Sequence, residues 1–423
     1  MRIVTPTEEQ AAWADLEIGL LAHLDLQVFD SSYTHETQMR ELRNPSIFNP
    51  ADLDTDKWCS TAAKAGAKYF VLTAKHCSGF CLWPTKVHDY SVASSPWKSG
   101  KGDIVKDFFA SCQKYGLKPG LYYSVSSNGY YKVYNSGKPS QESPISQQEY
   151  NDVVIRQLTE LWTWYGPVFE IWFDGGVIPV SEGGPDVEGL MKKLQPNAIV
   201  FQGPPGTKSL IRLVGNEHAT PNKDCSATVR GDYSFFHGGT EQLGSGDQSG
   251  DLWSMAECDM PARDASKAYL GGWFWRKGED QYVFDKDKLF ERYIGAAGHN
   301  GNLLIGVVID DRGQIPETDT EALLGLGEHI RNAFNEEKRI DAKGLRLSVP
   351  EERKIDYIVI SEDIRFGERI TGFELKRNNV VIEKGVIIGH KRMILTGGLT
   401  GGEYELVVLS CKDEPIIKQF SAY

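Results

Sequence analysis

Residues 67–85, AKYFVLTAKHCSGFCLWPT, begin as an apolar run and end in a loop crowded with reactive side chains. The run 67–74 has the length and composition of a buried strand, and segments with helical periodicity lie on either side of it, at 54–66 and 102–116. Near-continuous apolar strands that alternate with helices are typical of a parallel sheet covered on both faces. This stretch therefore predicts an α/β fold, with the reactive loop at the carboxyl end of a strand.

The same alternation extends along most of the chain. Further strands are predicted at 17–24, 118–125, 168–175, 197–203 and 211–217, a helix at 146–166 and a last strand at 298–306. A doubly wound open sheet would place polar side chains at the same strand ends. The number of candidate strands favours a (β/α)8-like barrel of the TIM type.

The character of the sequence changes after residue 203. Residues 203–275 are rich in glycine, proline, serine and tryptophan and predict long irregular loops, and helical periodicity returns at 285–297 and 317–336. After Lys343 the chain consists of short alternating runs separated by turn residues, which is typical of a small β-sandwich. We predict a (β/α)8-like catalytic domain at 1–338 and a C-terminal β-sandwich domain at 339–423.

The 423 residues carry 46 basic and 58 acidic side chains, so the formal net charge is −12. This charge opposes binding to phosphate backbones and anionic lipid, so neither nucleic acid nor a membrane is an expected partner. The first residues contain no apolar signal core, which predicts a cytoplasmic protein as the chain is given, or a periplasmic or secreted one if a signal was removed. The oligomeric state is left open.

Polar side chains end several predicted strands, at the edge that carries the active site in such barrels: His23, His76, Tyr123, Asp174 and Glu217. Asp174 follows an aromatic-rich run in FEIWFDGG (169–176), where two glycines permit a tight turn and close approach by a ligand. An aspartate that caps this turn would look the same. Glu217 ends IRLVGNE (211–217) in a similar way, although a surface glutamate would look no different. Cleavage of a glycosidic bond requires at least two carboxyl groups, and here they would come from two separate strand ends.

The reactive loop could be a metal site, a redox pair or the wall of a pocket. His76, Cys77 and Cys81 supply at most three zinc ligands, and the spacing of the cysteines differs from that of a thioredoxin-type motif. No metal and no cofactor is therefore expected. His76 and His23 could donate hydrogen bonds to hydroxyls of a neutral ligand, or each could be a satisfied core histidine. Five residues of the irregular region could wall a pocket or pack a loop: Trp253, Glu257, Cys258, Trp273 and Trp275.

These stretches resemble glycoside hydrolase family 29, the α-L-fucosidases. The resemblance covers about residues 15–315 and depends most on LTAKHCSGFCLWPT (72–85) together with IWFDGG (171–176). It is supported by VGNE (214–217), WSMAECDM (253–260) and GNLLIGVVIDDRG (301–313). The resemblance implies a (β/α)8-like barrel followed by a β-sandwich, a fucosylated oligosaccharide or glycan as substrate, and a retaining mechanism without metal.

The resemblance also implies individual roles. Asp174 would be the nucleophile that forms a covalent fucosyl-enzyme, and Glu217 would be the general acid/base. Four further residues would bind fucose: His23, His76, Tyr123 and Trp172. Tyr123 is the less certain match, because either tyrosine of LYYS (121–124) could face inward.

Two departures from the family pattern concern the sugar pocket. Many members have a second His and then an Asp where this chain has Cys77 and Ser78, and FDSSYTHE (29–36) lacks the Trp of a usual Glu-Trp pair. The blocks VGNE, AECDM and SEDIRFGERI (361–370) resemble the subgroup that prefers α-1,3/1,4-linked fucose, which we expect here. The alternatives are a fucosidase of broad specificity that also accepts other linkages and aryl fucosides, a fucose-binding protein with impaired catalysis, and a barrel metallohydrolase using His23 and His76.

Overall fold

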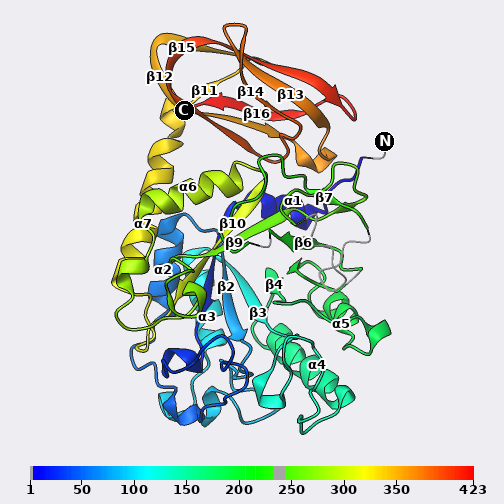
Figure 1. The fold of residues 1–423 in the computed structure, drawn as a ribbon, viewed down its shortest axis with the longest axis vertical. Helices are drawn as coiled ribbons and strands as arrows, with labels where there is room; N and C mark the ends of the chain where they lie inside the picture. Colours follow the sequence, from blue (N-terminus) through cyan, green and yellow to red (C-terminus); the bar gives the residue numbers. More distant parts are fainter. Residues whose placement is uncertain (1–2, 205, 215, 232–242) are drawn as a thin grey trace.

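The structure, a computed structural model, describes residues 3–204, 206–214, 216–231 and 243–423. Within these residues eight parallel strands close a barrel in the order β1-β10-β9-β6-β5-β4-β3-β2, which confirms the predicted barrel (Figure 1). The strands are β1 Ile18–His23, β2 Tyr69–Lys75, β3 Lys118–Tyr123, β4 Glu170–Trp172, β5 Ile199–Phe201, β6 Leu210–Leu213, β9 Ala256–Pro261 and β10 Gly301–Val308.

Helices surround the barrel (Figure 1). They are α1 Glu8–Ala14, α2 Thr55–Ala65, α3 Ile104–Tyr115, α4 Gln147–Trp164, α5 Val187–Leu194, α6 Lys286–Ala297 and α7 Glu317–Ala333. Asp54 and Asp103 cap α2 and α3 by accepting hydrogen bonds from first-turn amides, and Gly66 and Gly116 end these helices in left-handed conformation. None of the helices in the described residues is long and apolar enough to cross a bilayer.

Strand β2 shows how side chains alternate across the barrel wall. Tyr69 and Val71 belong to the buried cluster at the barrel centre, whereas Phe70 packs outward, its ring centroid 5.2 Å from that of Phe108 on α3. Gly19 on β1 faces the Tyr69 ring, which would lie 2.2 Å from a Cβ at position 19. The absence of a side chain at this position therefore lets Tyr69 fill the barrel.

One barrel strand, β9, lies inside the region predicted to be irregular. Glu257 and Asp259 face the barrel interior, while Cys258 and Met260 join the outer core. Polar residues at the inward positions interrupt the apolar run by which the other strands were recognised. Apart from the barrel strands β6 and β9, the strands in the described part of this region form one short antiparallel pair, β7 Thr228–Val229 with β8 Leu252–Trp253.

The chain after α7, which is described throughout, forms an antiparallel sheet at one end of the molecule (Figure 1). Its strands are β11 Ile340–Asp341, β12 Arg346–Glu362, β13 Ile370–Arg377, β14 Val380–Gly385, β15 Arg392–Cys411 and β16 Ile417–Ala422, in the order β11-β16-β12-β15-β13-β14. β12 and β15 shift register between Val349 and Lys354, and their two halves pair with different neighbours around a separate core. The predicted C-terminal β-domain is confirmed, while the boundary at 338/339 stays a prediction.

Candidate active site

A cavity of about 340 Å³ opens at the carboxyl ends of the barrel strands. The structure brings five of the six predicted site residues to its wall: His23, His76, Trp172, Asp174 and Glu217. Each comes from the end of a strand or the loop that follows it, which is why residues up to 194 positions apart in the sequence meet here. This end of a barrel is where active sites are built.

Asp174 lies two residues after β4 and lines the cavity. Its Oδ2 accepts a hydrogen bond of 2.8 Å from the Tyr122 hydroxyl, and its backbone carbonyl accepts one of 2.7 Å from Ser126. Gly175 has φ 72°, and a Cβ there would lie 2.6 Å from the Ser126 hydroxyl, so this sharp turn requires glycine. Burial raises the pKa of the Asp174 carboxyl; the hydrogen bond from Tyr122 opposes this rise and the charge of Glu217 adds to it.

Glu217 reaches the cavity from the loop after β6, and its side chain is exposed. Trp273 Nε1 donates a hydrogen bond of 3.2 Å to Glu217 Oε2. The backbone of Glu217 has φ 49°, a left-handed conformation that persists in a non-glycine residue only where the surroundings hold it. Trp273 in turn lies over Gly306 of β10, where a Cβ would be 2.2 Å from the indole ring. Gly306 therefore makes room for the ring that holds Glu217.

The two histidines are neutral at physiological pH. Burial lowers the pKa of His23 to about 3, and burial together with the neighbouring His23 lowers the pKa of His76 well below its usual value. The His76 ring stacks on Tyr122 with centroids 5.5 Å apart, and its Nδ1 lies 3.1 Å from the Cys77 Sγ. Neutral imidazoles can both donate and accept hydrogen bonds, which suits hydroxyl groups.

Trp172 is the floor of the cavity. Its ring stacks between Tyr122, at 5.2 Å, and Phe201, at 3.9 Å, and its Nε1 donates a hydrogen bond of 2.9 Å to Glu257. Glu257 also accepts a hydrogen bond of 2.7 Å from the Tyr69 hydroxyl, deeper in the barrel. A packed column of aromatic and carboxyl groups thus supports the strand that carries Asp174.

Tyr123 does not reach the cavity, so its predicted sugar contact is corrected. Its hydroxyl donates a hydrogen bond of 2.6 Å to Gln157 of α4, and its ring packs in the outer core beside Lys75. Successive side chains of a strand point to opposite faces. Because Tyr123 points outward on β3, the adjacent Tyr122 is the tyrosine that lines the cavity.

The reactive loop after β2 separates into a cavity part and a packing part. His76 and Cys77 line the cavity, whereas Phe80 packs on Phe48 with centroids 4.9 Å apart and Trp83 donates a hydrogen bond of 2.8 Å to Glu160. Cys81 is fully buried. Among the described residues no group of three or more His, Cys, Asp or Glu side chains is arranged to hold a metal ion.

Sequence reasoning missed several cavity residues. Gln202 follows β5 and accepts a hydrogen bond of 2.9 Å from Gly175 N, and Asp259 lies on the unpredicted β9. Gln202 could have been found, because it ends a predicted strand. Leu21 of β1 and Leu213 of β6 also line the cavity. The other wall residues come from loops whose convergence has no sequence signal: His35, Gln38, Met39, Ser127, Asn135, Leu270 and Gly271. Of the five residues left open, Trp273 walls the cavity and Glu257 lies inside the barrel. Trp253 and Cys258 are buried packing residues, and Trp275 is partly buried against the outer core.

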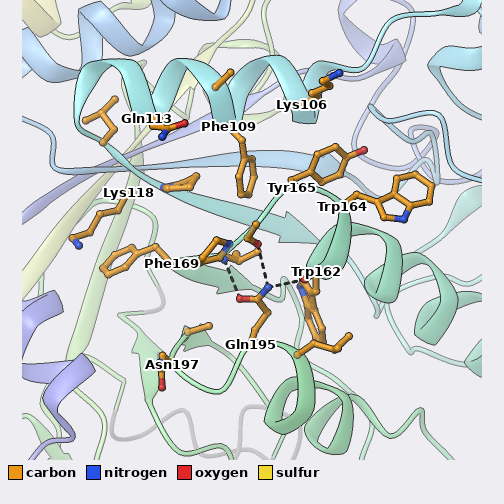
Figure 2. A pocket seen from close by; sticks show the side chains of 18 of the residues that line it. Lys106, Phe109, Gln113, Lys118, Trp162, Trp164, Tyr165, Phe169, Gln195 and Asn197 are labelled. Carbon is orange, nitrogen blue, oxygen red and sulfur yellow. Dashed lines mark hydrogen bonds between the residues drawn. The ribbon is translucent and has the colours of Figure 1, made fainter.

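A larger and more open groove of about 1240 Å³ lies at the opposite end of the barrel, between α3 and the segments before β4 and β5 (Figure 2). Gln195 in this groove donates hydrogen bonds to the carbonyls of Trp162 and Gly166 and accepts one from Val168 N. Its polar groups thus hold the loops together, and none of the predicted site residues reaches it. The smaller cavity is therefore the candidate active site.

The chain is similar to known proteins along its whole length. The family model described as Alpha-L-fucosidase matches residues 8–333. Alpha-L-fucosidase 1 of Arabidopsis thaliana is 27% identical over 479 residues, covering 99% of this chain and 87% of the relative. A crystal structure from Bacteroides thetaiotaomicron VPI-5482, provisionally classed as an α-L-fucosidase, is 32% identical with a TM-score of 0.92 and covers 100% of this chain and 99% of its own. A glycoside hydrolase 29 family member from an unknown rumen bacterium is 27% identical, with a TM-score of 0.82 over 100% of this chain and 77% of its own.

Proposed function

The chain belongs to the α-L-fucosidase family, glycoside hydrolase family 29, and we propose that it is a retaining exo-α-L-fucosidase that removes terminal α-L-fucose from fucosylated oligosaccharides or glycans. The observation that carries this proposal is the meeting of Asp174 and Glu217 in one small cavity at the carboxyl end of the barrel. Two carboxyl groups on either side of the scissile bond are what glycosidic cleavage requires.

In the first step Asp174 attacks the anomeric carbon of the fucosyl residue. The bond from Asp174 Oδ to this carbon forms as the glycosidic C–O bond breaks, and Glu217 gives its proton to the departing oxygen. Tyr122 orients the attacking carboxylate by donating to Oδ2. The product of this step is a covalent fucosyl-enzyme, with the aglycone released.

In the second step Glu217 takes a proton from water, and the water oxygen attacks the same carbon. The bond to Asp174 breaks, so that both carboxyl groups return to their starting states and the configuration is retained. For this route the two carboxyls approach to roughly 5–5.5 Å in the substrate complex. The exposed position of Glu217 gives it access to water.

Neutral groups around these carboxyls suit recognition of an uncharged sugar. We assign His23 and His76 to hydrogen bonds with fucose hydroxyls, since burial keeps both rings neutral. Trp273 offers an aromatic surface for the apolar side of the ring, whereas Trp172, stacked between Tyr122 and Phe201, would contact the sugar with the edge of its ring. Tyr122 takes the place expected for Tyr123.

We assign α-1,3/1,4-linked fucose as the preferred linkage. The support is the similarity of VGNE, AECDM and SEDIRFGERI to the corresponding blocks of the narrower subgroup. A panel of α-1,2, α-1,3, α-1,4 and α-1,6 fucosides with one aryl fucoside tests it. The expected result is fastest turnover of α-1,3 or α-1,4 linkages, with α-fucose appearing first. Equal rates across the panel would favour the broad-specificity alternative, and fucose binding without turnover would favour the impaired one.

The nucleophile is tested with Asp174→Gly. The variant should lose about three orders of magnitude or more in kcat with aryl fucosides, because no covalent intermediate can form. Added azide should restore turnover and yield β-fucosyl azide, since it attacks from the face that Asp174 occupied. Retention of wild-type activity without azide would exclude Asp174 as nucleophile.

The general acid is tested with Glu217→Ala. Loss of proton donation should slow natural glycans by about 10²- to 10⁴-fold, while an aryl fucoside with a good leaving group should be affected far less in its first step. Equal slowing of both substrate classes would contradict the acid role.

A further inference from the structure

Asp259 is a third carboxyl in the candidate active site, with no role in the two steps above. It lies on β9 between Cys258 and Met260, and its side chain lines the cavity although it is only 3% exposed. Its backbone carbonyl accepts a hydrogen bond of 3.2 Å from Ala219 N, in the loop that carries Glu217. The residue thus adjoins both the rigid barrel wall and the loop that carries Glu217.

No donor from another described residue satisfies the Asp259 carboxyl. Its Oδ1 is buried without a hydrogen-bond partner. Buried carboxyl oxygens in folded proteins are nearly always hydrogen-bonded, and exceptions call for a ligand or a functional role. An unsatisfied carboxyl at the wall of a ligand cavity is therefore a candidate for substrate binding.

The largest electrostatic effects on Asp259 come from other acids. The ionisable groups with the largest electrostatic effects on it are Glu217, Glu257 and Asp174, which are acids from the loop after β6, from β9 and from the turn after β4. Burial, followed by these three neighbours, raises the pKa of Asp259 well above its usual value. Several carboxyls this close together cannot all be ionised, and burial favours the protonated form of Asp259.

We propose that Asp259 is a substrate-binding residue that acts as a neutral carboxylic acid, with its O–H donating to, and its C=O accepting from, ring hydroxyls of the bound fucosyl residue. This assignment rests on the proposed fucosidase function. It differs from the roles of Asp174 and Glu217 because no bond is made or broken at Asp259. A neutral acid also avoids adding a further negative charge next to the nucleophile.

The sharpest test compares Asp259→Asn with Asp259→Leu, both assayed with an aryl fucoside and with free fucose as inhibitor. An amide has the same shape as a protonated acid and keeps one donor and one acceptor, so Asp259→Asn should stay within about 3-fold of wild type in kcat/KM. Asp259→Leu keeps the branched shape in a larger side chain but forms no hydrogen bonds, and should weaken fucose inhibition by about 10- to 100-fold. Cys258→Ala, the outward neighbour on the same strand, is the matched control and should leave both values within about 2-fold.

A second measurement does not depend on turnover. The infrared spectrum of the wild type at neutral pH should contain a carbonyl band of a protonated carboxylic acid that is missing in Asp259→Asn. Absence of such a difference band, or a loss of more than about 100-fold in Asp259→Asn, would overturn the neutral-acid assignment. If Asp259→Leu does not fold, Asp259→Ser removes the carboxyl at smaller volume and serves in its place.

Failure of this inference can be told apart from failure of the proposed function. If Glu217→Ala has the leaving-group dependence of a lost acid and Asp259→Leu binds fucose as tightly as wild type, only the inference is wrong. If instead the leaving-group dependence appears in Asp259→Asn and not in Glu217→Ala, Asp259 is the general acid and the assignment of Glu217 fails.

Discussion

Cys77 places a thiol in the wall of the cavity, 3.1 Å from Nδ1 of His76. Burial, with a smaller contribution from Asp25, raises the pKa of this thiol well above its usual value, so it stays protonated and can donate to Nδ1. The proton of His76 would then sit on Nε2, in position to donate to a sugar hydroxyl. Cys77 stands where many family members have a second histidine. Its thiol would therefore supply the hydrogen bond that orients His76.

This orientation makes a prediction for two variants. Cys77→Ser keeps a donor next to Nδ1 and should retain kcat/KM within about 3-fold. Cys77→Ala removes it and should lower kcat/KM by about 10-fold, mostly through KM, which corresponds to one lost hydrogen bond. Steady-state kinetics on an aryl fucoside measures both. Equal losses in the two variants would mean that Cys77 matters through packing and not through its proton.

A residue of the candidate site could be predicted from the sequence where a single reactive side chain stands at the end of a recognisable strand. Asp174 and His76 follow directly from apolar runs whose ends are visible, whereas Trp172 was expected only from the family resemblance. Tyr122 and Tyr123 could not be separated, because the run in which they lie is apolar on both faces and carries no alternation. Gln38 and His35 reach the cavity only through the path of a long loop, which local sequence does not specify.

Among the secondary-structure elements, β9 carries both a residue of the cavity wall, Asp259, and a buried carboxyl that affects stability, Glu257. Glu257 of β9 and Glu170 of β4 are fully buried carboxyls inside the barrel, linked to Trp172, Tyr69 and Trp13 by hydrogen bonds. Burial raises the pKa of Glu257 to about 7, and raises that of Glu170 well above its usual value. A strand such as β9 is not recognised from an apolar run in the sequence, because its inward positions hold acids where other strands hold mostly apolar residues.

The raised pKa of Glu257 predicts how stability depends on pH. Near pH 6 the folded chain binds protons at this site that the unfolded chain has lost, so stability is highest below about pH 4.5 at this site and falls as the pH rises to about 7. In Glu257→Gln this contribution is absent. Urea unfolding at pH 5 and pH 8 should therefore show a smaller loss of stability in the variant than in the wild type. Parallel losses in the two proteins would contradict the raised pKa.

Strand β10 has a glycine, Gly306, at the position where a side chain would collide with Trp273. In Gly306→Ala the new methyl group would meet the Trp273 ring and displace it from Glu217. Displacing a supporting group by about 1 Å can cost 100-fold in rate, and we expect kcat on natural glycans to fall by about 10- to 100-fold.

A matched glycine lies in α6. At Gly295 a Cβ would meet nothing closer than 3.9 Å, so Gly295→Ala should leave kinetics unchanged and stabilise the fold by about 0.5–1 kcal/mol. If Gly306→Ala also has unchanged kinetics, Trp273 does not position Glu217.

At the scale of the whole molecule, the C-terminal domain contacts the barrel near the segment that follows Glu217. Glu368, 3% exposed, accepts hydrogen bonds of 2.7 Å from Ser226 and 2.8 Å from Ala227 N, and another from Asn300. Arg392 joins Asp224 and Glu383 in the same area. A second contact, between Asp15 and His390 with Lys418, is more exposed.

These two contacts should differ in their contribution to stability. Glu368→Ala leaves three buried donors without an acceptor and should lower the free energy of unfolding by about 2–4 kcal/mol. Asp15→Ala breaks ion pairs of a half-exposed side chain and should cost about 1 kcal/mol or less. Urea unfolding at neutral pH measures both, and a smaller effect of Glu368→Ala than of Asp15→Ala would show that the buried contact is not the stronger link. The domain arrangement itself was visible in the change of sequence pattern after Lys343, but the contacts between the C-terminal domain and the barrel join residues more than 65 positions apart and have no local signature.

The packed column below Trp172 has a consequence for how ligands come and go. In the described part of the chain, Tyr69, Glu257, Glu170 and Trp13 fill the barrel beneath the cavity. The site is then a dead end with one entrance. Only the tip of a glycan chain can enter, and the free sugar must leave by the same opening before another tip arrives. Fucose released into the medium should therefore compete directly with incoming substrate, and high product concentrations should slow the enzyme.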